Sequence, residues 1–166
     1  MVRVFRATVW VALSLTAAAC GKAGTKDAGA AVQALLAAAQ AGDVQAFEAG
    51  IDRPALREDL RRQIAALAVQ SGLDVGGPSD LALDKMIGPD AFHLSLGGAP
   101  LTAPPSVAQV AAQLKPAGKD RVCLHDLAAP QACRLTFARE AAGWRLVALP
   151  ADHPTIELAP EPPKTK

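Results

Sequence analysis

DRPALREDLRRQIAALAVQSG, residues 52–72, is the strongest helical segment of the chain, and the expected fold is organised around it. Asp52 can cap the helix, Pro54 is tolerated in its first turn, and Gly72 is a typical end. The apolar residues recur at helical spacing along one face, formed by Leu56, Leu60, Ile64 and Leu67. Charged residues cover the other side between positions 57 and 62, so we expect one buried face and one solvated face.

Two further helices are expected before this segment. The first begins near Gly29 and ends at Gly42, with an apolar face formed by Val32, Leu35, Leu36 and Ala39. Asp43 can then cap a short second helix that carries Phe47. Residues 20–28, CGKAGTKDA, are mostly small and polar, so we expect them to form a flexible tether in front of the fold.

After the central segment the helical pattern returns twice. A short helix is expected from Ser79 or Asp80 to the Gly88-Pro89 pair. Another is expected from about Ser106 to residue 114, where the segment 116–118 closes it. The stretch between these helices alternates only weakly, at Phe92, Leu94 and Leu96.

Near residue 121 the hydrophobic period changes from helical to extended. Residues 121–126, 132–138 and 144–149 are three short strand candidates separated by turn-like segments, which predicts an antiparallel meander. Five prolines follow between positions 150 and 163, and we expect residues 152–166 to form an extended tail. The sequence therefore predicts a single α+β domain over residues 29–151, with N-terminal helices packed on a small C-terminal three-stranded antiparallel sheet.

Parts of the chain resemble an uncharacterised bacterial family, a domain of unknown function in small envelope or membrane-associated proteins. The resemblance rests on residues 41–43 (AGD), 47–48, 51–60 (IDRPALREDL) and Gln63, and on a closing strand at 143–150 (GWRLVALP). It covers roughly residues 30–150, although only the two ends are distinctive. The family offers no catalytic residues, and the Asp-x-Pro-Ala-Leu-Arg run is explained by a capped helix with its first buried leucine.

The first 21 residues have the layout of an export signal. Arg3 and Arg6 precede an apolar run over residues 7–19, which is too short to span a membrane and ends in three alanines before Cys20. Residues 15–21, LTAAACG, resemble the lipobox of bacterial lipoproteins, which implies that residues 1–19 are removed and Cys20 is lipidated. Ala17 departs from the branched aliphatic residue usual in lipoboxes, and Ala17-x-Ala19 also fits ordinary secretory cleavage, which would leave Cys20 unmodified.

The resemblance to lipoproteins also indicates where the mature chain is held. Gly21 follows Cys20 in place of the aspartate that retains many lipoproteins at the inner membrane, so we expect the outer membrane, with the domain facing the periplasm. The mature chain is close to neutral once Arg3 and Arg6 leave with the leader, because 17 basic and 16 acidic residues are present in all. This charge gives no reason to expect a nucleic acid partner.

Catalytic motifs are not evident. The sequence contains no His-Glu-x-x-His, no Gly-x-Ser-x-Gly and no glycine-rich phosphate loop, and its three histidines are scattered. With four Phe, two Trp and no Tyr, an aromatic binding platform is not expected. We therefore expect no enzymatic activity, no cofactor and no metal site.

Cys123, His125 and Cys133 form the one constellation that could carry chemistry. Cys123 and His125 point to the same face of a strand, and Cys133 could join them as a third soft metal ligand. A closed zinc site needs four ligands, and exported thiols meet an oxidising compartment, so we expect a Cys123–Cys133 disulfide. With the cysteines directly opposed, Leu135 would share a face with polar residues while Leu124 took the other. Either a bulge or partial cover of both faces would resolve this mismatch.

These patterns predict a lipid-anchored cell-envelope protein with a structural or binding role and no catalytic centre. Its partners would be the membrane, through lipid on Cys20, and another envelope protein. The alternative is a ligand-binding or enzymatic domain with a pocket between sheet and helices. That alternative requires inward polar groups around Phe92, Phe137 and Trp144, whereas a scaffold would fill the same space with apolar side chains.

Overall fold

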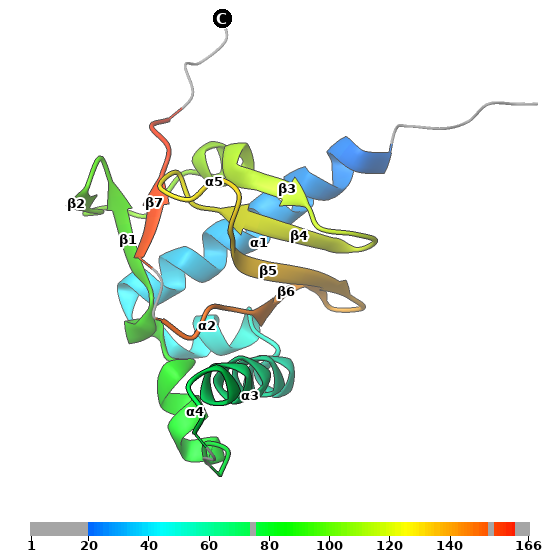
Figure 1. Ribbon diagram of the computed structural model, residues 1–166. Helices are drawn as coiled ribbons and strands as arrows, with labels where there is room; N and C mark the ends of the chain where they lie inside the picture. Colours follow the sequence, from blue (N-terminus) through cyan, green and yellow to red (C-terminus); the bar gives the residue numbers. More distant parts are fainter. Residues whose placement is uncertain (1–19, 74–75, 153–154, 162–166) are drawn as a thin grey trace, which may run out of the picture.

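The computed structural model describes residues 20–73, 76–152 and 155–161 (Figure 1). The expected signal peptide, residues 1–19, and the end of the expected tail, residues 162–166, lie outside the described residues. Within the described part, no helix combines the length and the apolar character needed to cross a membrane.

The described residues form a mixed α+β fold with two sheets. The predicted α+β class is therefore confirmed, although the sheets differ from the prediction. The helices lie mainly in the N-terminal half: α1 (Cys20–Ala41), α2 (Val44–Ala49), α3 (Arg53–Gln70), α4 (Asp80–Met86), the 3₁₀ turn η1 (Pro89–Ala91) and α5 (Val107–Gln113). The strands are β1 (His93–Leu96), β2 (Ala99–Pro100), β3 (Leu114–Pro116), β4 (Arg121–His125), β5 (Cys133–Glu140), β6 (Gly143–Ala148) and β7 (Thr155–Leu158).

Helix α1 is the long central element, and it passes behind the four-stranded sheet in Figure 1. Its expected face is buried, since Val32, Leu35, Leu36 and Ala39 all belong to the core. The helix also begins earlier than expected, at Cys20, so residues 20–28 are helical and the predicted tether is wrong. At the end of this segment α1 packs closely on α5, because Ala28 is fully buried and a Cβ on Gly29 would lie 3.3 Å from the Ala111 Cβ.

The start of α3 is fixed to the sheet through backbone hydrogen bonds. The Asp52 N–H donates to the Leu146 carbonyl over 2.9 Å, and the Leu146 N–H donates to the Gly50 carbonyl over 3.0 Å. The Asp52 side chain accepts from the Ala55 N–H at the helix N-cap, as the sequence predicts. The capped turn and these two bonds therefore set the direction of α3 relative to β6.

The larger sheet has the strand order β3-β4-β5-β6, with every neighbouring pair of these strands antiparallel. The expected three strands are β4, β5 and β6, and the prediction of a three-stranded sheet misses β3. The sequence pattern predicts a helix through residue 114, but α5 ends at Gln113 and the backbone of Leu114 is already in the β conformation. Pro116 ends β3 at the sheet edge, where a missing N–H removes no ladder hydrogen bond.

A bulge between Leu124 and His125 resolves the register mismatch anticipated from the sequence. Leu124 pairs with Leu135 and Val122 with Phe137, so these four apolar side chains all face the core. The cysteines are consequently not directly opposed: Cys123 pairs with Thr136, and Cys133 pairs with His125.

The smaller sheet has the order β2-β1-β7 and contains the clearest correction to the sequence analysis. Residues 155–158, expected within an extended tail, form β7 parallel to β1, with Leu94 opposite Ile156. Ile156 and Leu158 are fully buried. The many prolines indicated an extended tail, but residues 155–158 (TIEL) lie between two prolines and alternate polar and apolar side chains. A proline outside the strand removes none of its ladder hydrogen bonds.

Candidate functional site

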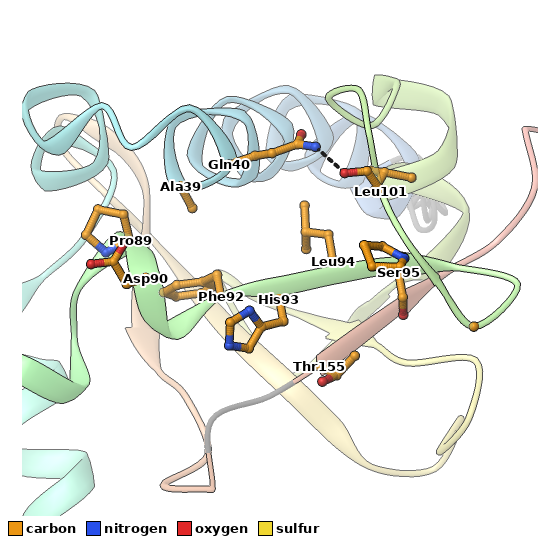
Figure 2. A pocket seen from close by; sticks show the side chains of 12 residues that line it. Ala39, Gln40, Pro89, Asp90, Phe92, His93, Leu94, Ser95, Leu101 and Thr155 are labelled. Carbon is orange, nitrogen blue, oxygen red and sulfur yellow. Dashed lines mark hydrogen bonds between the residues drawn. The ribbon is translucent and has the colours of Figure 1, made fainter.

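A cavity of about 610 Å³ lies where the C-terminal end of α1 meets the smaller sheet (Figure 2). Its walls come from α1, η1, β1, the β2 turn and the start of β7, so segments far apart in the sequence meet there. The lining residues are Ala39, Gln40, Pro89, Asp90, Phe92, His93, Leu94, Ser95, Gly98, Pro100, Leu101 and Thr155. Ligand sites in proteins typically have volumes of about 300–1,000 Å³, so this cavity has room for a small molecule.

Gln40 closes one wall of the cavity. Its amide N–H donates to the Leu101 carbonyl over 2.7 Å, which ties α1 to the chain that leaves β2 (Figure 2). The Leu101 N–H in turn donates to the Leu94 carbonyl over 2.9 Å. These bonds hold the backbone of Leu94 and Leu101, two residues that line the cavity, against each other and against α1.

The β1–β2 turn is held by a carboxylate from β7. Ser95 and the Gly98 N–H, both from residues that line the cavity, donate hydrogen bonds to Glu157, the latter over 3.0 Å. The Ser95 hydroxyl bond, followed by the backbone bonds from Gly98 and Gly97, holds the pKa of Glu157 below its ordinary value. Glu157 is thus a stable anion beside the cavity.

The formal charge of the lining is negative. Asp90 contributes a carboxylate from η1, and none of the described residues that line the cavity is a lysine or an arginine. Asp90, His93 and Thr155 are exposed, so their polar groups are available at the opening, whereas Phe92 and Leu94 are buried. The site combines an apolar interior with polar groups at its opening.

The alternative function requires a pocket around Phe92, Phe137 and Trp144. Of these three residues only Phe92 lines the cavity. Phe92 lines the cavity and stacks edge-on against Phe47, with ring centroids 5.3 Å apart. Phe137 is buried in the core, and Trp144 lies partly buried with the Arg139 guanidinium 6.0 Å from its ring. The space near Phe137 is therefore apolar, and the cavity lies elsewhere.

The residues that form the cavity carried little signal in the sequence. His93, Ser95 and Thr155 come from two strands that pair in parallel, 62 positions apart in the case of His93 and Thr155. Gly97-Gly98 was the only local sign, and such a pair indicates a turn without indicating a site. The weak alternation at Phe92 and Leu94 could have suggested β1, but its partner fell within the expected tail.

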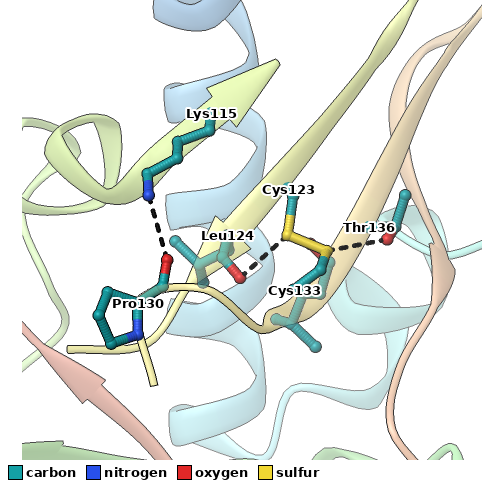
Figure 3. Close-up of a disulfide and its surroundings, with 7 residues drawn as sticks. Lys115, Cys123, Leu124, Pro130, Cys133 and Thr136 are labelled. Atoms are coloured by element: carbon teal, nitrogen blue, oxygen red, sulfur yellow. Dashed lines mark hydrogen bonds between the residues drawn. A yellow bond between two sulfur atoms is a disulfide. The ribbon is translucent and has the colours of Figure 1, made fainter. Parts of the chain in front are cut away.

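The structure contains the predicted disulfide between Cys123 and Cys133, with their Cα atoms 5.6 Å apart (Figure 3). The Thr136 hydroxyl lies 3.2 Å from the Cys133 sulfur, and Lys115 on β3 donates over 3.1 Å to the Pro130 carbonyl in the loop between β4 and β5. A disulfide offers no thiolates, so Cys123 and Cys133 do not form the alternative metal site with His125. Among the residues that the structure describes, no cluster of three or more metal-ligating side chains occurs.

Cys20, the expected lipidation site, is the first residue of α1. The helix is continuous from Cys20 to Ala41. It enters the core at Ala28 and Val32, which are fully buried. The structure therefore brings Cys20 close to the domain and far along α1 from the cavity, which adjoins Ala39 and Gln40.

Comparison with known proteins adds a family match over the helical half of the chain. No curated protein and no solved structure matches the chain. The family model described as "Protein of unknown function (DUF2939)" matches residues 15–94, a range that includes α1 to α4, η1 and the start of β1. The predicted closing strand at 143–150 lies outside this match. The match over residues 15–94 agrees with the expected resemblance to an uncharacterised domain family.

Proposed function

We propose that this chain is a cell-envelope protein anchored through lipid on Cys20, whose domain binds a partner or ligand and has no catalytic centre of its own. The observation that carries the proposal is the leader: two arginines, a short apolar run and a small-residue site that ends at the first of only three cysteines. More than one acyl chain is needed for stable anchoring, and lipoprotein acylation supplies several.

The disulfide supports an exported location. Disulfides persist in oxidising compartments such as the periplasm and are rare in the cytosol. Lipid on Cys20 leaves Cys123 and Cys133, the two cysteines that are joined. Every cysteine of the chain is then accounted for.

Helix α1 supports a domain held near the membrane. Because residues 20–28 are helical at about 1.5 Å per residue, the buried Ala28 lies only about 12 Å from Cys20. A flexible tether would have let the domain move further from the surface. The partner is therefore expected at or near the periplasmic face of the membrane, which we propose to be the outer membrane.

The cavity favours ligand binding over a purely structural role. A scaffold fills such a space with apolar side chains, whereas this cavity combines an apolar interior with Asp90, His93 and Thr155 at its opening. Among the described lining residues, the Ser95 hydroxyl is hydrogen-bonded to Glu157 and not to an imidazole, which supports a binding role for this hydroxyl over a nucleophilic one.

Labelling with palmitate tests the anchoring. The wild-type protein is expected to incorporate the label and to sediment with membranes, while Cys20→Ser loses both and accumulates as precursor. The double variant Cys123→Ala/Cys133→Ser should keep the label, which shows that the acylated residue is Cys20. Efficient cleavage of the wild type to an unlabelled soluble product would contradict the proposal and favour ordinary secretory cleavage.

A second substitution tests the membrane. Gly21→Asp introduces the residue that retains many lipoproteins at the inner membrane, so the labelled protein should move from the outer to the inner membrane fraction in a density gradient. Gly21→Ser is the matched control and should stay in the outer membrane. Identical fractionation of both variants with the inner membrane would contradict the outer-membrane assignment.

A further inference from the structure

We propose that the cavity between α1 and the smaller sheet binds a small organic cation, an amine or quaternary ammonium with an apolar body. This inference rests on the proposed binding role and gives the chemical class of the ligand. Two features of the cavity carry it, an apolar interior and a one-sided charge distribution.

The interior suits an apolar body of modest size. Phe92, Leu94 and Leu101 present aromatic and aliphatic surface, and Pro89 and Pro100 border it (Figure 2). The Phe92 ring is held by its edge-on contact with Phe47, so its position is fixed before a ligand binds. A fixed aromatic surface favours cations, because the negative face of the ring attracts positive charge.

The charges at the cavity favour a positive ligand and oppose a negative one. Asp90 is the carboxylate in the lining. Glu157 adds a second carboxylate next to the lining, where it accepts hydrogen bonds from the Ser95 hydroxyl and the Gly98 N–H. A bound cation has Asp90 as its partner. An anion would enter a lining in which none of the described residues is a lysine or an arginine, and the carboxylates would repel it.

The experiment compares three probes of nearly the same shape: 2-phenylethylammonium, 2-phenylethanol and 3-phenylpropionate. Their affinities for the purified mature protein are measured by titration calorimetry at one ionic strength. The cation is expected to bind about five-fold more tightly than the neutral alcohol, as an ion pair at a partly exposed site allows. The anion is expected to bind most weakly.

Substitutions at Asp90 assign the preference to the cavity. Asp90→Asn should reduce the preference for the cation over the alcohol, and Asp90→Lys should make the anion the tightest of the three probes. Asp120→Asn is the matched control, since Asp120 is an exposed residue in the turn between β3 and β4 and does not line the cavity. This control should leave the order of the probes unchanged.

The outcomes separate the ligand class from the binding role. Equal affinity for all three probes, or an order that Asp90→Lys leaves unchanged, overturns the cation inference and leaves the cavity as a binding site. Binding of none of the probes to folded protein overturns the inference together with the ligand-binding part of the proposed function. Lipid anchoring is tested independently, by the palmitate label on Cys20.

Discussion

Leucines on the same predicted face of α3 differ in their contribution to the core. Leu56 and Leu60 are fully buried, whereas Leu67 is 55% exposed, so the expected four-residue face is wrong at its last position. Helix α3 packs against β6, but the contact does not bury Leu67 in its last turns. The periodicity specifies which side of a helix is apolar, but it does not specify how far the neighbouring sheet reaches.

Alanine substitutions at Leu60 and Leu67 measure this difference. Leu60→Ala is expected to lower the free energy of unfolding by about 2–5 kcal/mol, because it removes buried methyl groups and leaves a cavity. Leu67→Ala makes the same chemical change at an exposed site and should stay within about 0.5 kcal/mol of the wild type. Urea unfolding of both variants gives the values, and equal losses would show that α3 is buried along its whole length.

Gln63 shows a polar residue with a role that its sequence position does not reveal. It follows directly after the charged residues of α3, yet its amide donates to the Leu149 carbonyl over 2.8 Å and accepts from the Ala151 N–H over 3.0 Å. Both partners lie more than 80 positions away along the chain. The side chain thereby holds the segment that leaves β6 against α3.

At the scale of elements, α3 and α4 are joined by ion pairs that the sequence analysis interpreted as a solvated charge run. Arg57 donates to Asp84 over 2.6 Å and Arg53 donates to it over 3.0 Å, while Arg61 pairs with Asp80. The hydrogen bond from Arg57 is the main reason that the pKa of Asp84 falls from 3.8 to about 2. The charged side of α3 is therefore the surface on which α4 docks.

This lowered pKa predicts how stability depends on pH. A carboxyl group whose pKa is lower in the folded state stabilises the fold above its unfolded value, near pH 3.8, and loses that contribution as the pH falls towards 2. The melting temperature of Asp84→Asn should therefore lie below that of the wild type at pH 5, and the two should converge near pH 2. Asp120→Asn, the exposed control, should show no such convergence. A difference that persists at pH 2 would mean that Asp84 acts by packing and not by charge.

Strand β7 makes a second prediction at this scale. Ile156 is fully buried opposite Leu94, so Ile156→Ala is expected to cost about 2–5 kcal/mol in urea unfolding. Thr155→Ala, at the exposed neighbouring position, should change stability by no more than about 0.5 kcal/mol. If both variants unfold like the wild type, residues 155–158 belong to a tail, as the proline pattern indicated.

At the scale of the whole molecule, the disulfide restrains the hairpin between β4 and β5 near the centre of the larger sheet (Figure 3). Its two residues are 10 positions apart. On the chain-entropy model, a loop of this size stabilises the folded state by about 2.5–3 kcal/mol. The bridge therefore makes the stability of the whole domain sensitive to the redox state of its compartment.

Reduction tests this dependence. The variant Cys123→Ala/Cys133→Ser should be about 2.5–3 kcal/mol less stable than the oxidised wild type. Adding dithiothreitol should lower the stability of the wild type towards that of the variant and leave the variant unchanged. Titration of the denatured, unreduced protein should find neither cysteine reactive. Two reactive thiols would show that the pair is not joined.

The sequence by itself determined the local elements of this protein. Capping residues such as Asp43, Asp52 and Ser106 accept the hydrogen bonds expected of them, because a cap depends only on residues within one turn. Apolar spacing likewise identified the buried face of α1 and three strands of the larger sheet. The export signal expected at residues 1–19 made the disulfide an expected pairing, since disulfides persist in oxidising compartments.

Only the tertiary structure decided the features that depend on distant partners. β7 becomes a strand because β1 offers it a parallel edge, and the bulge at Leu124 depends on which side chains the core accepts from β5. The cavity requires α1, β1 and β7 to meet around residues that carry no motif, so no local pattern could indicate it. Backbone conformation and capping are short-range, whereas pairing and burial belong to the assembled chain.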